Sequence, residues 1–526
     1  MPNGIEITLN LLTRTDNESA VPVLIAALDS PDPAIQEGAL IAMLHRRTPA
    51  GGREILERLP HMKPDWKAIV AQYHGRLTQT LRDAILGTNA ALCDNGCRAT
   101  VLFRDYDLIP TLLSALEAPN PPKAELLAST VVELVESLYD ELAGNRDPSD
   151  RRDPQIIRRH VVASLEQSVQ RFGHKHNRRE VLECFLMLVG RENVTLRQVL
   201  QNPHHAAFGP IVEMLAKSVR RGVIRLLLTF LDDVRESAAM ISLVSGRTDT
   251  QFIHYWLKKI GREPSSAVAQ NLKRIDSIPW LAGDKRLLEQ LDDASQHALV
   301  RLVMTASIPR PLAYATVEQV LLHGKPGGRQ EAARALAEFH GSEANALAVR
   351  AMEDPDPQVQ ANLVPQLRGR GIPGILPRLL ELVESPYEVV RRAVRESLSE
   401  FNFKRFMASF DLMDDAVRRS TGLLVKKIDA QTVPLLTEEL KSPIRTWRIR
   451  GLIIARTIGA VESVEREVAA LLDDEDHLVR LEAVATLARA TTESSRQSLR
   501  RAALDKSEVV REAARRGLEE QAEVPS

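Results

Sequence analysis

The sequence predicts an all-α fold, an alpha-solenoid (superhelix) of stacked antiparallel helix pairs, and three observations support this prediction. Aromatic residues are 4% and charged residues 26% of the 526 residues, a balance that favours amphipathic helices over strands. The chain is too long for one globular core, which stops growing at roughly 250–300 residues. A helical pattern also recurs along the chain at the short interval typical of repeat proteins.

The repeat is clearest in the C-terminal half, where seven segments share one helical pattern. Each segment follows another helical segment, and a polar turn rich in Asp, Ser and Pro joins the two, as such residues end one helix and cap the next. One such pair cannot bury its apolar side alone, so the pairs are expected to stack. The seven segments begin at Arg329, Gln360, Arg391, Arg418, Arg450, Arg480 and Arg511, with spacings of 31, 31, 27, 32, 30 and 31 residues.

The layout of these repeats resembles the HEAT-repeat family, in particular the short bacterial repeats similar to those of phycobilin lyases. The pairs that carry the resemblance are Val390 with Arg391, Val417 with Arg418, Ile449 with Arg450, Val479 with Arg480 and Val510 with Arg511. In that family the arginine bonds to a turn aspartate of a neighbouring repeat, which forms a ladder. The resemblance implies that Asp354, Asp414, Asp473 and Asp505 are the acids here. It also implies a break at the Lys441 turn, which has no acid.

The pattern divides the chain into four regions. Residues 1–47 hold an N-terminal HEAT-like repeat, 48–310 hold degenerate longer helix pairs, 311–520 hold the regular short repeats, and 521–526 are expected to fray. The segment 144–154 is rich in Gly, Pro, Asp and Arg and is the candidate hinge loop.

Composition and motifs argue against several classes of function. The formal net charge of −1 gives no global polycation, and three cysteines are too few for a disulfide framework. We find no signal peptide and no apolar stretch long enough for a membrane span, so a cytoplasmic location is expected. No hydrolase, zinc-protease or nucleotide-binding motif is present. We therefore expect no enzyme activity, no cofactor and no metal.

Two groups of residues could still suggest metal or redox chemistry. Cys93 and Cys97 flank an Asn-Gly step that we interpret as a turn, but a structural zinc site needs four ligands and no second cysteine pair exists. The histidine pairs at 174 and 176 and at 204 and 205 lack an acidic or cysteine partner nearby. We interpret them as solvated loop histidines.

Charge separates between the two layers of the C-terminal repeats. The second helices of six pairs carry a formal charge of +10, whereas the first helices with their turns carry −8. In HEAT proteins the second helices line the concave side, and part of their charge should be neutralised in the ladder. The remaining cations predict a concave groove that attracts an acidic protein segment; an ordinary solvated face is the competing interpretation. The candidate partner-binding residues are Arg392, Arg395, Arg419, Lys426, Lys427, Trp447, Arg448 and Arg456.

A second basic region lies at 146–226, with 15 Lys or Arg against 8 Asp or Glu. Several cations on one face could contact phosphates, although few aromatic residues interleave for base stacking. The candidate nucleic-acid residues are Arg158, Arg159, Arg178, Arg179, Arg220 and Arg221.

The sequence thus favours a non-catalytic scaffold that binds a protein partner along the concave surface. A nucleic-acid-binding repeat protein and a HEAT-fold enzyme of the lyase or glycosylase kind remain as alternatives. The partner and the oligomeric state are left open.

Overall fold

In a computed structural model, residues 4–119, 121, 123–144, 152–283 and 286–523 are described, and the regular structure is helical. An isolated bridge between Phe172 and His176 is the β-structure present in these ranges. The contacts divide the chain into unit 1, Met1–Ala313, and unit 2, Tyr314–Ser526. No helix in the described ranges has both the length and the apolar character that a membrane crossing needs. Most of the candidate hinge loop, residues 145–151, lies outside the described residues.

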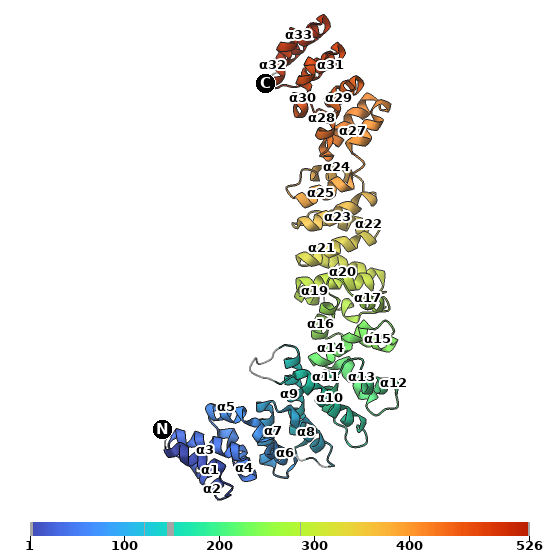
Figure 1. Ribbon diagram of the computed structural model, residues 1–526. Coiled ribbons are helices and arrows are strands. Elements are labelled where there is room, and N and C mark those ends of the chain that lie inside the picture. Colours follow the sequence, from blue (N-terminus) through green and yellow to red (C-terminus); the bar gives the residue numbers. More distant parts are fainter. Residues whose placement is uncertain (1–3, 120, 122, 145–151, 284–285, 524–526) are drawn as a thin grey trace. The chain divides into compact units, whose positions relative to one another are not determined.

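The α-helices of unit 1 stack in chain order (Figure 1). They are α1 (Gly4–Arg14), α2 (Ala20–Ala27), α3 (Pro33–Arg46), α4 (Pro49–Arg58), α5 (Pro64–Gln72), α6 (Thr78–Leu86), α7 (Ala90–Phe103), α8 (Ile109–Leu116), α9 (Ala124–Leu142), α10 (Pro154–Gln170), α11 (Arg179–Leu188), α12 (Val194–Gln201), α13 (Phe208–Lys217), α14 (Arg221–Thr229), α15 (Ala238–Gly246), α16 (Thr250–Ile260), α17 (Ser266–Leu272), α18 (Arg286–Gln290) and α19 (Asp293–Thr305). The boundary between the units falls within α20 (Arg310–His323).

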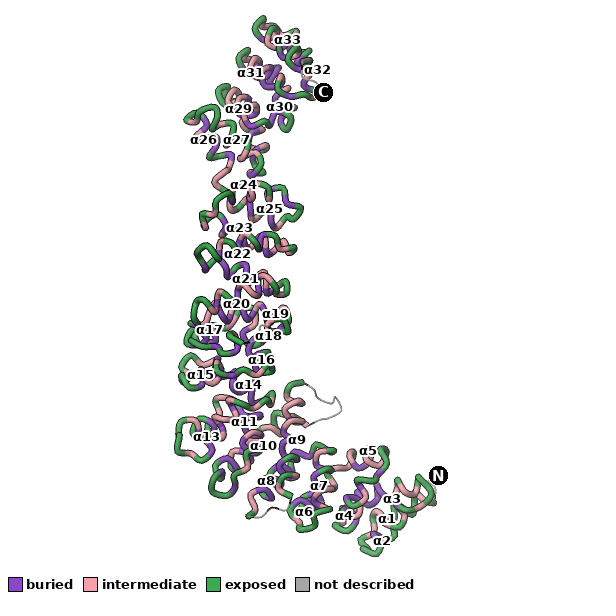
Figure 2. The backbone as a smooth tube through the Cα atoms, turned by 180° about the vertical axis from the view of Figure 1, so that it is seen from behind, coloured by how far each residue is buried: buried purple, intermediate pink, exposed green. Residues whose placement is uncertain are grey.

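Unit 2 is a run of short helix pairs, each with a first and a second helix. The second helices pack on one another, α21 to α23 to α25 and then α27 to α29, α31 and α33. Figure 2 shows the buried residues on the sides where helices meet. The helices are α21 (Pro326–Ala335), α22 (Ser342–Ala351), α23 (Pro357–Gly369), α24 (Ile375–Leu382), α25 (Glu388–Ser397), α26 (Phe403–Ser409), α27 (Asp415–Ile428), α28 (Thr432–Leu440), α29 (Arg445–Thr457), α30 (Glu465–Ala470), α31 (His477–Leu487), α32 (Glu493–Ala502) and α33 (Glu508–Glu523).

The turn before five of the second helices, α23, α25, α29, α31 and α33, is held by the fourth residue of the helix. This side chain, an arginine or a glutamine, reaches back to the backbone carbonyl six residues earlier. The bonds run from Gln360 to Asp354, Arg391 to Ser385, Arg448 to Ser442, Arg480 to Asp474 and Arg511 to Asp505, at 2.6–2.9 Å. Gln36 of α3 makes the same bond to Ser30 in unit 1. This hydrogen bond from the fourth residue of a helix to the preceding turn is therefore present in both units.

A ladder of ion pairs links some neighbouring repeats. The fourth-residue arginine binds an aspartate in the turn of the next repeat, in the pairs Arg329–Asp354, Arg448–Asp474 and Arg480–Asp505, at 2.8–2.9 Å. Each aspartate also accepts a backbone N–H two residues later, so one side chain shapes its own turn and binds its neighbour.

The ladder corrects part of the sequence prediction. Arg448, not Arg450, is the ladder arginine of α29, and Asp474, not Asp473, is its partner. Asp414 is not a ladder acid, because it caps α27 by accepting the N–H of Val417. The reason is one of register: Arg450 lies two residues further along α29 and donates to the carbonyl of Met407.

Other turns have a residue that cannot complete the ladder. The position held by Asp474 in the α31 turn is held by Ser385 before α25, Leu412 before α27 and Ser442 before α29. At Ser442, the predicted break at the Lys441 turn is present, because Arg418 of the preceding second helix meets no aspartate at this position. Arg418 donates instead to the carbonyls of Phe410 and Asp411 and pairs with Asp415 in its own helix.

The missing link between α23 and α25 can be rebuilt, because the bond of Gln360 matches the regular turn geometry. We expect Gln360→Arg and Ser385→Asp together to stabilise unit 2, with a favourable coupling of about 1–2 kcal/mol. The aspartate can still accept the N–H of Tyr387, which Ser385 accepts now. A double-mutant cycle measured by urea unfolding tests this, and zero coupling would show that the ladder depends on more than these two positions.

Candidate partner-binding surface

The predicted cations of α25 and α27 lie on one face of their helices. On α27, Arg419, Leu423 and Lys426 are spaced four and three residues apart, which aligns them along the helix. Arg392 and Arg395 have the same alignment on α25. Leu423 is 51% exposed, although it is apolar. We call these five residues the second-helix face.

The cations of this face are short of acidic partners. Arg392 and Arg419 are exposed, and no ion pair of either is found among the described residues. The Nε atom of Arg395 is buried without a hydrogen-bond partner in the same ranges. Lys426 donates to the backbone carbonyl of Gly459, and it has no carboxylate partner in the described part of the chain. The face therefore keeps a positive charge beside an exposed leucine.

Three other predicted partner-binding cations are neutralised. Lys427 pairs with Glu384 at 2.8 Å, and Arg456 pairs with Glu482 at 2.8 Å. Arg448 belongs to the ladder, and only 17% of its side chain is exposed. The positive region is therefore smaller than the sequence indicated, and it is confined to α25 and α27.

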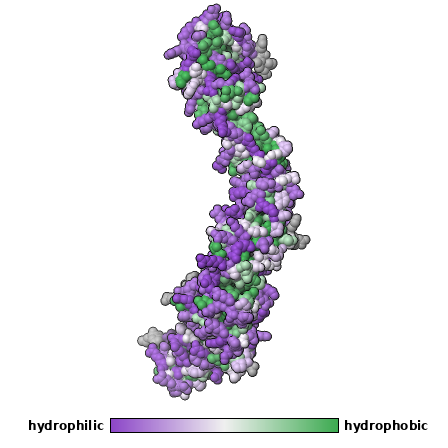
Figure 3. All heavy atoms as spheres, turned by 90° about the vertical axis from the view of Figure 1, so that its right-hand side faces the viewer, coloured by the Kyte–Doolittle hydropathy of each residue, from purple (hydrophilic) through white to green (hydrophobic). Residues whose placement is uncertain are grey.

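Trp447 lies apart from these cations, in a groove of about 450 Å³. It is the third residue of α29 and is 49% exposed. Figure 3 shows hydrophobic side chains gathered in patches towards the C-terminal end of unit 2, on a surface that is otherwise largely hydrophilic. The groove is lined by Phe403, Lys404, Met407, Leu435, Glu438, Glu439, Lys441, Ser442, Pro443 and Trp447.

In unit 1, most of the candidate nucleic-acid arginines are already engaged. Arg179 pairs with Glu213, and Arg220 pairs with Glu136 and, at 3.7 Å, with Glu183. Arg221 lies 3.9 Å from Asp140.

The other three arginines differ from one another. Arg158 donates to the carbonyl of Leu188 at 2.7 Å, and its pKa is lowered by burial and then by the charge of Arg225. Arg159 is exposed and Arg178 is half-buried, without an ion pair in the described ranges. Two cations are few for a phosphate-binding surface at physiological salt.

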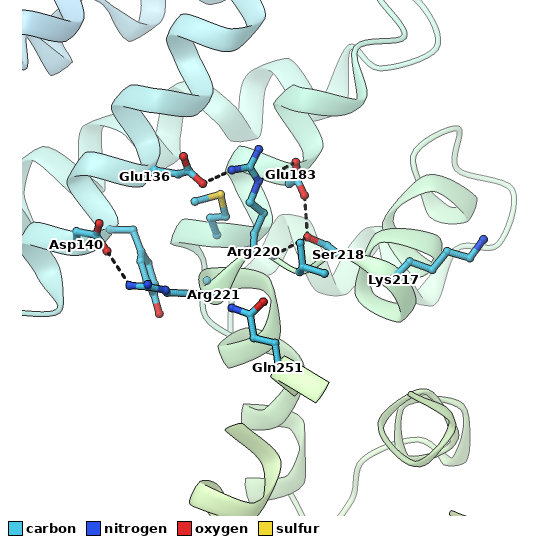
Figure 4. A pocket seen from close by; sticks show the side chains of 12 residues that line it. Glu136, Asp140, Glu183, Lys217, Ser218, Arg220, Arg221 and Gln251 are labelled. Carbon is cyan, nitrogen blue, oxygen red and sulfur yellow. Dashed lines mark hydrogen bonds and ion pairs between the residues drawn. The ribbon is translucent and has the colours of Figure 1, made fainter. Parts of the chain in front are cut away.

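Arg220 and Arg221 line a pocket of about 640 Å³ between α9, α11 and α14. In Figure 4 Arg220 points at Glu136 and Glu183, while Arg221 reaches Asp140 on α9. The three carboxylates and three cations of the lining balance, since Lys217 is the third cation. Opposite charges that satisfy one another leave no single activated acid, base or nucleophile, so this arrangement serves to join α9, α11 and α14.

The candidate metal and redox residues lie in structural surroundings. The Asn-Gly step between Cys93 and Cys97 is not the turn that the sequence predicted, because α7 continues through it and Gly96 packs closely on Ala84. His176 is buried and not solvated, with Nε2 3.1 Å from Ser168 Oγ. In the part of the chain that the structure describes, no three His, Cys, Asp or Glu side chains gather as metal ligands would.

The C-terminal end also differs from the prediction. Gln521 was expected to fray, but it is buried in α33 and donates to the carbonyls of Leu487 and Ala490. Residues 524–526 of the predicted tail lie outside the described residues.

Sequence reasoning missed Leu423 and the groove residues around Trp447. Leu423 could have been found, because it lies on the same helical face as Arg419 and Lys426. Phe403 and Met407 carry no such signal, because they line a surface formed by two successive repeats.

One family model and several solved structures are similar to this chain. Residues 314–399 match a family model described as HEAT repeats. No curated protein matches the chain. Among solved structures, yeast importin-beta (Kap95p) is 12% identical, with 98% of this chain and 82% of that chain covered and a TM-score of 0.24. An engineered protein is 15% identical, with 96% and 99% covered and a TM-score of 0.18. Kap121p bound to Pho4p is 13% identical, with 93% and 54% covered and a TM-score of 0.23.

Similarity at these identities and TM-scores gives no information about the partners of this protein. The helix pairs and the family match concern the fold: the described residues form helices, and residues 314–399 match HEAT repeats.

Proposed function

We propose that the protein is a non-catalytic scaffold that binds an acidic segment of a partner protein on the second-helix face of α25 and α27. The observations that carry this proposal are the exposed Arg392 and Arg419, which have no ion pair in the described part of the chain, and the exposed Leu423 on the same face of α27 as Arg419. Unpaired cations attract an acidic chain over a distance of about 8–10 Å at physiological salt. The leucine supplies an apolar contact that does not depend on salt.

The chemistry of such a partner follows from this face. An amphipathic segment with carboxylates flanking a hydrophobic residue would place its apolar side on Leu423 and its acids near Arg419 and Lys426. Helical segments often dock in this way, with anchors three or four residues apart. We infer that this face is the concave one, because second helices line the concave side of HEAT proteins, and α25 packs on α23 while α27 packs on α29. We also propose a cytoplasmic setting, in keeping with three buried cysteines that form no disulfide.

Peptide selection tests the proposal even though the partner is unidentified. A displayed library of random peptides is selected on the wild-type protein, and the enriched peptides are measured for affinity. We expect enrichment of Asp and Glu next to a hydrophobic residue. We also expect Arg392→Glu with Arg419→Glu to weaken binding at least about tenfold, because both attraction and register are lost.

The matched control makes the same change in charge on the first helices. Arg405→Glu on α26 and Arg466→Glu on α30 replace two exposed arginines outside the second-helix face. We expect this control to keep the affinity within about twofold at moderate salt, because distant exposed charges are screened. Equal losses in both double variants, or no enrichment of acidic peptides, would contradict the proposal.

A further inference from the structure

The groove around Trp447 lies beside the start of α29, which differs from the start of four other second helices. The third residue of the second helix is a fully buried valine in α23, α25, α31 and α33. In α29 this position holds the larger Trp447, which is 49% exposed. Phe403 and Met407 of α26 and Leu435 of α28 form the apolar part of the groove beside it.

The groove also carries negative charge. Glu438 and Glu439, adjacent residues of α28, both line it. Burial raises the pKa of Glu439, and the charge of Arg450 opposes this only in part, so the carboxylate lacks full compensation. Glu438 is exposed and has no ion pair among the described residues.

Two lysines line the same groove, but one of them is already engaged. The Lys441 ammonium lies 3.4 Å from Glu467, which lies outside the groove lining. Lys404 is exposed and without an ion pair in the described ranges. Two carboxylates thus face a single uncommitted cation, and an added positive charge would improve the balance.

We propose that this groove binds an arginine or lysine side chain from a basic segment of a partner protein. The alkyl stem would pack on Met407 and the indole of Trp447, and the charged head would lie near Glu438 and Glu439. Cations are attracted to the face of an indole, and long basic side chains bury their stems while their heads stay solvated. This site is separate from the second-helix face and takes the opposite charge.

An acidic segment fits the groove less well, because it would approach two carboxylates with only Lys404 to receive it. A purely apolar segment would cover Glu439 without a partner, which adds a desolvation cost to its binding. The charge of the groove therefore selects the occupant, whereas its apolar lining supplies contact area.

The test uses the full chain labelled with 5-fluorotryptophan and followed by fluorine NMR. The chain has four tryptophans, and Trp447→Phe identifies the signal of Trp447. The probes are three short peptides of the pattern Gly-Leu-X-Leu-X-Gly, where X is arginine, its neutral isostere citrulline, or glutamate. We expect the arginine peptide to shift the Trp447 signal in a saturable manner, and the other two to bind at least about tenfold more weakly.

Variants can remove the negative charge of the two carboxylates while the fold is kept. Glu438→Gln with Glu439→Gln keeps the size of both side chains and is expected to weaken the arginine peptide at least about tenfold. Glu381→Gln, an exposed glutamate of α24 away from the groove, is the control and should leave the affinity unchanged. Equal binding of the citrulline peptide, tighter binding of the glutamate peptide, or no shift with any peptide would each overturn the proposal.

Discussion

Replacing Arg480 by methionine is expected to destabilise the C-terminal repeats by about 3 kcal/mol, because it leaves a shielded carboxylate without its cation. Arg480 is 3% exposed and binds Asp505 through Nε and Nη2 at 2.9 and 3.1 Å. It also donates to the carbonyls of Asp474 and Glu475. Methionine keeps most of the alkyl stem of arginine, so the loss of stability reflects the loss of the hydrogen bonds and the ion pair of Arg480. Urea unfolding measures the change in the free energy of unfolding, and hydrogen exchange of α31 to α33 locates that change in these repeats.

The matched control is Arg391→Met, at the same position of α25. The Arg391 side chain is 28% exposed and binds an acid of its own helix, Glu388, instead of an acid of the next repeat. We expect this change to cost about 1 kcal/mol or less. Similar losses for both variants would show that the link between repeats adds nothing to the local turn.

The pH dependence of the Arg480 variant should have a definite sign. Burial alone would raise the pKa of Asp505, but the hydrogen bond from Arg480, the N–H of Ser507 and the charge of Arg480 together lower it. A lowered pKa in the folded state stabilises the protein above the ordinary carboxyl pKa of about 3.9, and this gain is lost as pH falls through the lowered value. In the variant, burial should dominate and raise the pKa. The stability difference should therefore be largest near neutral pH, shrink as pH falls through the raised pKa of the variant, and be lost only below the lowered pKa of the wild-type carboxyl.

Replacing Gly222 by alanine is expected to destabilise unit 1 by about 2–3 kcal/mol, since an added methyl would overlap a backbone that cannot move aside easily. A Cβ at Gly222 would lie 2.7 Å from the carbonyl oxygen and 2.8 Å from the Cα of Met187. The close approach of α14 to α11 at this point brings Arg220 and Arg221 to the acids of α9 and α11. The change should therefore also loosen the pocket of Figure 4. Thermal unfolding measures the loss.

Gly209→Ala in α13 is the control for Gly222, because nothing lies within 4 Å of a Cβ there. Alanine forms helix better than glycine, so this variant should be stabilised by roughly 0.5–1 kcal/mol. Opposite signs for the two glycines are the expected result. A small or favourable effect at Gly222 would mean that α11 and α14 can separate without cost.

The sequence by itself determined the helix pairs of unit 2 and the position of their turns. Apolar residues at helical spacing and the Asp, Ser and Pro of each turn are local signals, and the predicted turns at 353–357 and 473–476 contain the caps of α23 and α31. The same local logic found Arg391, Arg418, Arg480 and Arg511, because each is the fourth residue of its helix.

Only the tertiary structure decided which charges remain free. The sequence pattern indicates Arg450 as the ladder arginine of α29 and Arg448 as a free cation; the contact with Asp474 on the next repeat shows that Arg448 has the ladder role. Lys427 and Arg456 likewise look as free in the sequence as Arg419, and their carboxylate partners lie 43 residues before and 26 residues after them. Helical periodicity is a property of one segment, whereas neutralisation of a charge depends on which segments the fold brings together.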